Sequence, residues 1–419
     1  MTNPDPCFTD PFGSRIAAGL LLSLLCLPLL ICAGCARLVP PAREKPVVPL
    51  VLVKERKLPE FSDDMCFDGL SVSIRESLAY LHRLPSDRPI PFGTDTYTAA
   101  HLALSLERFA DFLRTRPDTA AVNRHIREQY RVYRAAGRQG KGEMLVTGYY
   151  EPFLQGSYQK NERFRYPLYR RPADLVSVDL SLFSDRFRGE TIWGRFDKNT
   201  LLPYYDRREI DSAGALSGKA DVLAWVDDRI DLFFLHIQGS GKLYMDTGEP
   251  LNVHYNSPNG RPYRSIGKLL IDNGAIAREK MSMQAIKTYL RANPDTADDI
   301  LNTNPSYVFF NTETEGPIGS IGVKLTPGRS IATDRQLFPK GALAFIETLK
   351  PLVDGNGHIE KWSEFGRFVL NQDTGGAIRG AGRADLFWGN GPYAELAAGY
   401  MQHRGALYFI VLKPDGEPD

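Results

Sequence analysis

The sequence predicts an α+β protein in which a helical N-terminal part precedes a longer, β-rich part. Two observations lead to this prediction. Apolar residues recur at helical spacing between residues 74 and 133, and this pattern ends in the glycine-rich run Gly137–Gly142. From Glu143 onward, short strand-like runs are separated by Gly, Pro and Asn. Many short strands of this kind favour one or two β-barrels.

The helical and strand-like segments can be placed in order. The helical pattern is carried by Ile74, Leu78 and Leu81, then by Leu102, Leu106, Phe109 and Leu113, and then by Ile126, Tyr130 and Tyr133. The predicted strands are Met144–Tyr150, Ile230–Ile237, Tyr307–Asn311, Ala342–Thr348, Gly366–Leu370 and Ala406–Leu412. Two short helices interrupt them, at Ser265–Asp272 and at Ser282–Arg291, where Ser282 is the expected N-cap.

The composition is that of an ordinary globular protein. The 419 residues are 43% hydrophobic and 24% charged, which allows two or three domains with an ample core. The formal net charge is +1 and no basic run occurs, so the sequence gives no reason to expect a nucleic-acid partner.

The N-terminus has the pattern of an export signal. The stretch Ile16–Ala36 is almost entirely apolar, follows Arg15 and closes on Cys32-Ala33-Gly34-Cys35. It resembles a signal peptide (1–35) ending in a bacterial lipobox, although Cys32 stands where Leu is usual. Cys35 is then the predicted lipidation site, and an uncleaved transmembrane anchor is the alternative. Because Ala36 carries no inner-membrane retention signal, we expect a lipid-anchored protein on the periplasmic side of the outer membrane.

Residues 36–65 are predicted to be a tether between the membrane and the folded part. Within this segment, Val39–Pro59 is rich in Pro, Lys and Val and has no helical or strand period.

Several classes of catalytic site have no counterpart in the sequence. The seven histidines show no metal-ligand spacing, and no His-Glu-x-x-His pair occurs. Ser240 lacks the glycine two positions before it that a nucleophile elbow needs, and there is no P-loop or dinucleotide-binding glycine pattern. We therefore expect no metal and no cofactor, and carboxylate chemistry remains.

The carboxylates that stand out lie near the C-terminus. The run Gln372–Gly380 contains Asp373, and the run Gly382–Gly389 contains Asp385, both among glycines. Asp385 precedes Leu386-Phe387-Trp388, where desolvation can raise a carboxyl pKa as a general acid requires. The alternative is a turn in which aspartates cap backbone amides.

Three further segments combine polar, aromatic and glycine residues as a carbohydrate cleft does. They are Thr147–Pro152, Phe234–Gly241 and Arg261–Lys268. Aromatic rings can stack on sugars, and amides and hydroxyls can bind sugar hydroxyls, although core packing is an equally simple role for the tyrosines. The candidate substrate-binding residues are Thr147, Tyr149, Tyr150, Gln238, Gly239, Ser240 and Arg264.

Five motifs, taken in order, resemble the membrane-bound lytic murein transglycosylase A family. They are Thr-Gly-Tyr-Tyr-Glu-Pro from Thr147, His-Ile-Gln-Gly-Ser-Gly from His236, Tyr-Arg-Ser-Ile-Gly-Lys from Tyr263, Asn-Pro-Ser-Tyr-Val-Phe-Phe from Asn304, and the C-terminal runs. The resemblance runs from about Asp68 to Lys413. It implies a double-psi β-barrel domain formed by 66–151 plus 271–413, with a second β-rich domain, 152–270, inserted into it.

The family's closing module, here about 318–413, is named for three aspartates, which match Asp334, Asp373 and Asp385. The resemblance assigns the catalytic acid to Asp385 and supporting roles to Asp334 and Asp373. Arg379 stands where many relatives have Lys. Glu151 and Asp373 are the rival candidates for the acid.

The resemblance implies a peptidoglycan lytic exotransglycosylase, a lyase that acts on glycan strands. Such enzymes cut the β-1,4 bond between N-acetylmuramic acid and N-acetylglucosamine without water and leave a 1,6-anhydro product. The internal C6 hydroxyl replaces the water that hydrolysis activates with a second carboxylate, so one aspartate can suffice. Two alternatives are a hydrolase with Asp373 or Glu151 as second carboxylate, and a non-catalytic murein-binding lipoprotein.

Overall fold

The computed structural model describes residues 48–376 and 378–414. The predicted signal peptide, Cys35 and the first part of the predicted tether lie outside this range. Within the described ranges, no helix is both long and apolar enough to cross a membrane. The chain from Val47 onward forms one compact unit.

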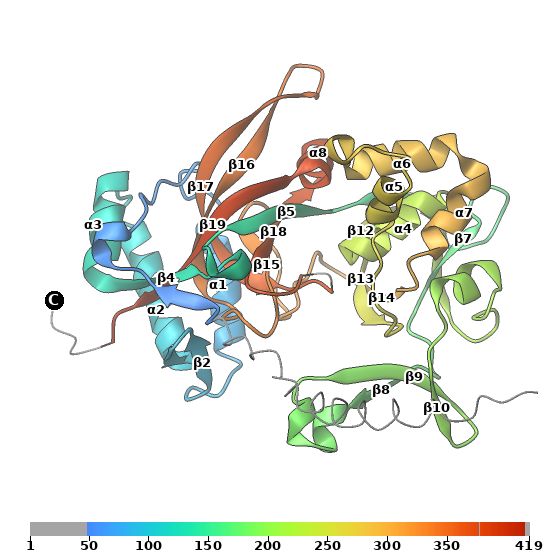
Figure 1. The fold of residues 1–419 in the computed structure, drawn as a ribbon, viewed down its shortest axis with the longest axis horizontal. Coiled ribbons are helices and arrows are strands. Elements are labelled where there is room, and N and C mark those ends of the chain that lie inside the picture. The colour runs from blue at the N-terminus through green and yellow to red at the C-terminus, as the bar shows by residue number, and fades with distance from the viewer. Residues whose placement is uncertain (1–47, 377, 415–419) are drawn as a thin grey trace, which may run out of the picture. The chain divides into compact units, whose positions relative to one another are not determined.

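A closed β-barrel is the centre of this unit (Figure 1). Its sheet has the order β1-β4-β19-β16-β17-β15-β18-β5, and the pairing of β19 with β5 closes the last six strands. The pairs β15–β17 and β18–β5 are parallel, and the other pairs are antiparallel. The strands are β1 (Leu50–Leu52), β4 (Tyr130–Ala135), β5 (Met144–Glu151), β15 (Ser330–Ala332), β16 (Leu343–Val353), β17 (Ile359–Asp373), β18 (Arg383–Asn390) and β19 (Gln402–Leu412).

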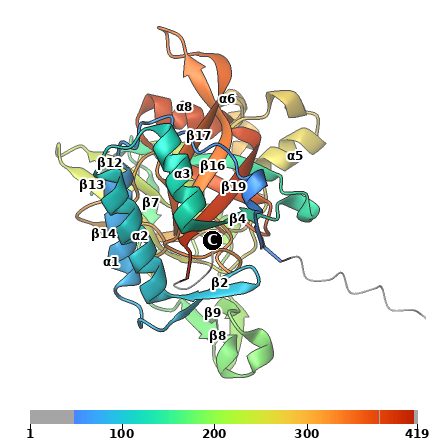
Figure 2. The same ribbon diagram turned by 90° about the vertical axis from the view of Figure 1, so that its left-hand side faces the viewer.

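Three helices pack beside the barrel, as the helical N-terminal pattern predicts (Figure 2). They are α1 (Leu70–Leu81), α2 (Ala99–Leu113) and α3 (Thr119–Gln129), and a hairpin of β2 (Pro89–Phe92) and β3 (Asp95–Thr98) precedes α2. Their apolar faces share one hydrophobic cluster with the barrel, where the Phe109 ring lies 5.3 Å from the ring of Phe368. One helical prediction is wrong: Tyr130 and Tyr133 lie in β4, because pairing with β1 and β19 outweighs the local spacing.

A second sheet has the order β14-β13-β12-β6-β11-β7, and a bridge between Arg170 and Phe310 brings its two edges together. Its strands are β6 (Phe153–Ser157), β7 (Tyr166–Tyr169), β11 (Val222–Val226), β12 (Ser240–Met245), β13 (Pro250–Pro258) and β14 (Val308–Glu313). The helices that accompany it are α4 (Arg229–Gln238), α5 (Ile266–Asp272), α6 (Met283–Ala292) and α7 (Pro294–Asn302). A last helix, α8 (Pro392–Tyr400), contacts β5 and β18 of the barrel.

One prediction for this region needs correction. The predicted strand at 230–237 is helix α4, which begins at the N-cap Asp228 and ends at Gly239 with φ +82°. Because α4 is buried on most of its surface, its sequence shows no helical period. Beyond residue 270, helices α6 and α7 pack with α4, and β14 pairs with β13 of the second sheet.

A third, smaller sheet is formed by β8 (Val176–Asp179), β9 (Thr191–Asp197) and β10 (Thr200–Pro203), coloured green in Figure 1. Trp193 on β9 packs against the hydrophobic cluster around Tyr204 and Tyr307. The sheet is therefore attached to the same part of the chain as the second sheet.

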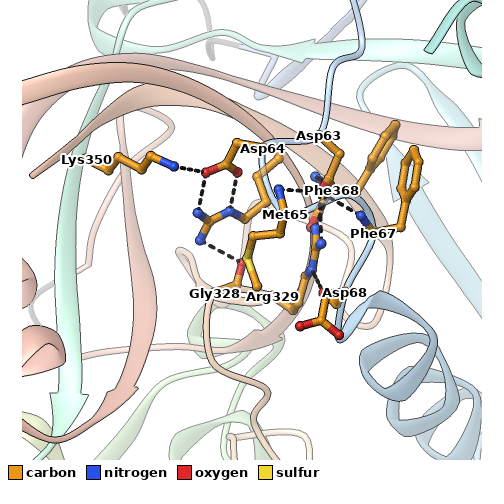
Figure 3. A network of polar contacts seen from close by, with 10 residues as sticks. Asp63, Asp64, Met65, Phe67, Asp68, Gly328, Arg329, Lys350 and Phe368 are labelled. Carbon is orange, nitrogen blue, oxygen red and sulfur yellow. Dashed lines mark hydrogen bonds and ion pairs between the residues drawn. The ribbon is translucent and has the colours of Figure 1, made fainter. Parts of the chain in front are cut away.

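The last part of the predicted tether belongs to the fold. Leu50–Leu52 pairs with β4, and the Phe61 side chain is buried in the barrel cluster. Figure 3 shows how the next residues are held: the Asp63 carboxylate accepts two hydrogen bonds from the Arg329 guanidinium, at 2.6 and 2.9 Å, and both side chains are fully buried. Asp64 binds Arg367 and Lys350 in the same network. Residues 50–65 thus differ from the solvated spacer that their composition predicts.

Candidate active site

The barrel strands bring the three aspartates of the C-terminal module to one end of the sheet. Strand β15 lies between β17 and β18, and its residue Ala332 is paired with Asp373 on one side and with Asp385 on the other. Asp334 follows β15 by two residues. Residues that are far apart in the sequence therefore meet because three neighbouring strands end, or pass, at the same level.

Asp385 is fixed by two polar neighbours. The Thr147 hydroxyl, on the adjacent strand β5, donates a hydrogen bond to Oδ1. The Arg383 guanidinium donates from Nε to Oδ1 at 3.1 Å and from Nη2 to Oδ2 at 3.3 Å. The Asp385 side chain keeps 14% of its surface exposed, so it stays within reach of a ligand. This geometry orients a carboxyl group and supplies a cation to balance its charge.

Asp373 has different surroundings. Its Oδ1 accepts hydrogen bonds from the backbone amides of Ser320 (2.9 Å) and Thr374 (2.8 Å), and its Oδ2 accepts one from the Tyr149 hydroxyl (3.0 Å). Burial raises the pKa of Asp373 to about 6, although all three of these hydrogen bonds favour the charged form. Leu386 and Trp388, which follow Asp385 in the sequence, are part of the barrel core.

Strand β5 supplies a donor to each of the two carboxyls. Thr147 and Tyr149 are two residues apart, so they lie on the same face of the strand, and they reach Asp385 and Asp373 respectively. Burial and the negative charges of both aspartates raise the pKa of the Tyr149 hydroxyl well above its usual value, so it remains a donor at neutral pH.

Asp334 holds the glycine-rich turn between β17 and β18. Its Oδ2 accepts a hydrogen bond from the Gly380 amide at 2.7 Å, and its Oδ1 accepts one from the Gln336 amide at 2.9 Å. Gly380 has φ +82°, a conformation that favours glycine. The buried Asp334 side chain contacts backbone amides, which is the arrangement of a residue that supports the turn.

Several predicted substrate-binding residues lie away from the two carboxyls. Tyr150 lies on the opposite face of β5 from Thr147, where its amide donates to Gln238 Oε1 and its hydroxyl lies 3.2 Å from Glu395 Oε1. Gln238 and Gly239 form the end of α4, and Ser240 is buried at the start of β12. The hydrogen bond between Tyr150 and Gln238 joins β5 of the barrel to α4 beside the second sheet. Arg264 is exposed, and its amide donates to Asn304 Oδ1.

Sequence reasoning missed three residues near the site. Arg383 precedes Asp385 by two residues, and strand alternation alone would have put both on one face. Tyr263 and Tyr255, from the second part of the chain, are exposed by 42% and 40%. Burial raises the pKa of each hydroxyl, and the charge of Arg383 opposes this rise at Tyr263, as that of Arg335 does at Tyr255. Both rings thus lie within electrostatic reach of arginines beside the aspartates.

The rival acid Glu151 lies in a separate place. It is paired with Asn390, five residues beyond Asp385 along β18, which corresponds to roughly 16 Å at the usual strand rise. Its Oε2 accepts a hydrogen bond from Asn390 Nδ2 at 3.1 Å. Glu151 instead lines a cavity of about 460 Å³ together with Tyr150, Lys287 and Glu395.

The described part of the chain has no candidate metal site. Among residues 48–376 and 378–414, no group of three or more His, Cys, Asp or Glu side chains is arranged to hold an ion. The chemistry that the described site offers is that of one oriented carboxyl, Asp385, beside a second, Asp373, with a raised pKa.

Known families match both parts of the fold. The MltA specific insert domain matches residues 145–311, a range that includes most of β14, and the 3D domain matches residues 329–411. The membrane-bound lytic murein transglycosylase A of Escherichia coli K12 is 35% identical over 281 residues, which cover 66% of this chain and 68% of the relative. The namesake protein of Vibrio cholerae is 34% identical over 282 residues, with coverage of 66% and 68%.

Solved structures agree with these sequence relatives. A membrane-bound lytic murein transglycosylase from Agrobacterium tumefaciens superposes with a TM-score of 0.71 at 31% identity, covering 87% of this chain and 98% of that one. E. coli MltA with bound chitohexaose gives a TM-score of 0.67 at 28% identity, with coverage of 87% and 95%. By sequence and by fold, the chain belongs to the membrane-bound lytic murein transglycosylase A family.

Proposed function

We propose that this protein is a lytic transglycosylase of peptidoglycan with Asp385 as its acid and base. It cleaves the β-1,4 bond between N-acetylmuramic acid and N-acetylglucosamine and leaves a 1,6-anhydromuramic end. The supporting observation is the Asp385 carboxyl, held by Thr147 and Arg383 at a partly exposed position in a chain of this family. Asp373 accepts three hydrogen bonds from the protein, which suits a supporting role.

The reaction needs one proton carrier. Protonated Asp385 gives its proton to the oxygen that leaves C1 of the muramic residue as the C1–O bond breaks. The muramic C6 hydroxyl attacks C1, and its proton passes to the Asp385 carboxylate, which restores the acid. Arg383 balances the negative charge that Asp385 carries between the two transfers. No water is consumed, because the nucleophile belongs to the substrate and is already positioned beside C1.

Substitution of Asp385 by Asn tests this assignment. The variant should release no anhydro-muropeptides from purified sacculi, while Asp299→Asn, at an exposed surface ion pair, should cleave normally. Mass spectrometry of the products distinguishes transglycosylation from hydrolysis, because an anhydro end is lighter by one water than a reducing end. Anhydro products from the Asp385 variant would refute the role of Asp385, and reducing ends from the parent protein would point to hydrolysis.

The glycan is proposed to bind against Thr147 and Tyr149 on the barrel side, with Tyr263, Tyr255 and Arg264 on the other side. The relative with bound chitohexaose supports a glycan ligand for this fold. Tyr150 and Gln238 are assigned to the framework of this groove because the Tyr150 amide donates to Gln238 between β5 and α4. Gly239 and Ser240 are assigned to it as the end of α4 and the start of β12.

The domain organisation and location belong to the same proposal. The parallel pairs within the closed six-stranded barrel support the double-psi connectivity. The packing of α6, α7 and β14 supports an inserted domain from residue 152 to about residue 313, longer than the 152–270 inferred from the resemblance. Relatives named membrane-bound support attachment to a membrane, which we assign to a lipid on Cys35 at the periplasmic side of the outer membrane.

A further inference from the structure

The third sheet carries an apolar face whose side chains are exposed or half-buried. In antiparallel strands, directly opposed residues share a face. Val178 is opposite Ile192, Val176 is opposite Gly194, and Leu201 is opposite Phe196. One face is therefore formed by residues of a single kind, all apolar: Val176, Val178, Ile192, Gly194, Phe196, Leu201 and Pro203.

The two faces of this sheet differ sharply. On the other face, Trp193 packs against the cluster around Tyr204, and a side chain on Gly260 would meet its Cβ at 2.5 Å. On the apolar face, no residue takes part in any hydrophobic cluster of the described chain. Ile192 is 44% exposed and Phe196 is 61% exposed.

The turn that follows β8 carries two further exposed apolar side chains. Leu182 and Phe183 follow β8 and are exposed by 83% and 73%. We call the apolar face together with Leu182 and Phe183 the apolar platform. Exposed apolar groups gathered in one place mark a surface that binds a partner or a membrane.

We propose that the apolar platform rests on the lipid surface to which the chain is tethered. Only 12 residues separate Cys35 from the first described residue, Val48, and the 13 steps between these two Cα atoms span at most about 45 Å. The folded part is thus kept within reach of the bilayer, given the membrane anchoring proposed above. Aromatic and aliphatic side chains that are presented on a rigid element can then enter the acyl boundary without refolding.

The charge around the platform predicts how it binds. Residues 176–203 contain four acidic residues (Asp179, Asp185, Glu190 and Asp197) and four basic residues (Arg186, Arg188, Arg195 and Lys198). With no net charge, the segment gains little from anionic headgroups. Contact with the bilayer should therefore depend on apolar burial and change little with salt.

Quenching by brominated lipids tests this placement. The chain from residue 36 onward, with a hexahistidine tag in place of Cys35, is held on vesicles that contain a nickel-chelating lipid and brominated acyl chains. The indole introduced by Phe183→Trp should be quenched at least threefold more than that of Val353→Trp, an exposed control at the end of β16. Molar sodium chloride should leave this difference unchanged, and an added Phe196→Asp should abolish it.

Two results would overturn the proposal. Equal quenching at the two positions would mean that the platform does not face the lipid. A dimer in sedimentation velocity without vesicles, lost on Phe196→Asp, would mean that a second copy covers the platform. Cleavage of sacculi in solution should be the same for all these variants, so failure of this inference is distinguishable from failure of the proposed reaction.

Discussion

Asp373 and Asp385 occupy the same level of the barrel, yet their partners divide their roles. The Asp385 carboxyl accepts hydrogen bonds from a hydroxyl and a guanidinium and stays partly exposed, so it is oriented without being enclosed. Asp373 accepts hydrogen bonds from two backbone amides and from the Tyr149 hydroxyl, so its position is tied to the turn after β17. Asp373 is thus held by the framework, and a raised pKa alone does not identify the acid.

Titration of Asp373 gives the first prediction at this scale. Carboxyl-carbon NMR should show a midpoint near pH 6 for this residue, because burial raises its pKa to about 6. Tyr149→Phe removes a donor that favours the charged form, so the midpoint should move higher. Tyr158→Phe, at an exposed tyrosine, is the control and should leave it in place. A midpoint near pH 4 in the parent protein would contradict the burial argument.

The same shift makes folding stability depend on pH. Because the folded pKa of Asp373 lies above its ordinary value of 3.8, its favourable contribution is complete below about pH 4 and is lost as the pH rises through about 6. In Asp373→Asn, urea denaturation should show a flatter stability profile between pH 4 and 7. An unchanged profile would mean that the carboxyl ionises in the folded state as easily as in the unfolded chain.

At the scale of elements, the sequence predicted best where packing leaves one face exposed. The spacing of Ile74, Leu78 and Leu81 predicted α1, and Ser282 was recognised as the cap of α6, where its hydroxyl accepts from the Ala285 amide. The segment that became α4 was predicted as a strand, since a helix buried on most sides loses its polar stripe. A periodic sequence pattern reveals only amphipathic elements, so an element that is buried on all sides is not recognised from it.

The candidate site was likewise predictable only where a local sequence pattern marks it. Asp385, Asp373 and Thr147 were proposed from motifs, because their neighbours along the chain are distinctive glycines and aromatics. The register that joins them, with Ala332 between the two aspartates, depends on pairing between strands distant in sequence. No local pattern contains that information. Adjacent strand residues point to opposite faces, so the Tyr149 hydroxyl contacts Asp373 while the Tyr150 hydroxyl contacts Glu395.

The loop from Asn259 to Arg264 presents an aromatic ring from a rigid base. The buried Asn259 amide donates to the carbonyls of Tyr205 (2.8 Å) and Pro305 (2.9 Å), and its Oδ1 accepts from the Arg261 amide. Asn304 Oδ1 accepts from the Arg264 amide at 3.0 Å. A sugar ring that stacks on Tyr263 would therefore contact a loop that is already ordered before binding.

Tyr263→Ala should weaken glycan binding without unfolding the protein. Loss of one stacking partner, worth about 0.5–1.5 kcal/mol, corresponds to a roughly two- to tenfold rise in the Kd for chitohexaose by calorimetry. Tyr263→Phe keeps the ring and should bind nearly as the parent does. Tyr158→Ala removes an equally exposed tyrosine elsewhere and serves as the control. Equal affinity for Tyr263→Ala and the parent would remove this residue from the binding surface.

At the scale of the whole molecule, the last part of the predicted tether is built into the barrel. Asp63 binds Arg329, which also donates to the carbonyls of Asp68 and Phe368 at 2.7 and 2.8 Å. Asp64 binds Arg367 and Lys350, on β17 and β16 (Figure 3). A pull on the tether is thus transmitted to barrel strands and not to a loose terminus.

Asp63→Asn should destabilise the whole unit. The change leaves the fully buried Arg329 guanidinium without its charged partner, a loss of about 3–5 kcal/mol in the free energy of unfolding. Asp111→Asn, in an exposed ion pair with Arg114, should cost less than about 1 kcal/mol. Urea denaturation followed by circular dichroism measures both. A loss below 1 kcal/mol for Asp63→Asn would mean that the segment docks on the barrel without contributing to its stability.

Asp64 makes this attachment sensitive to acid. Burial alone would raise its pKa, but the hydrogen bonds and charges of Arg367 and Lys350 outweigh burial and lower the pKa below 3.8. A lowered folded pKa means that the stabilising contribution is present above about pH 4 and is lost as the pH falls through the folded pKa. Urea denaturation between pH 6 and 2 should therefore show a smaller acid-induced loss of stability in Asp64→Asn than in the parent protein. Parallel curves for the two proteins would show that Asp64 does not link the tether's attachment to pH.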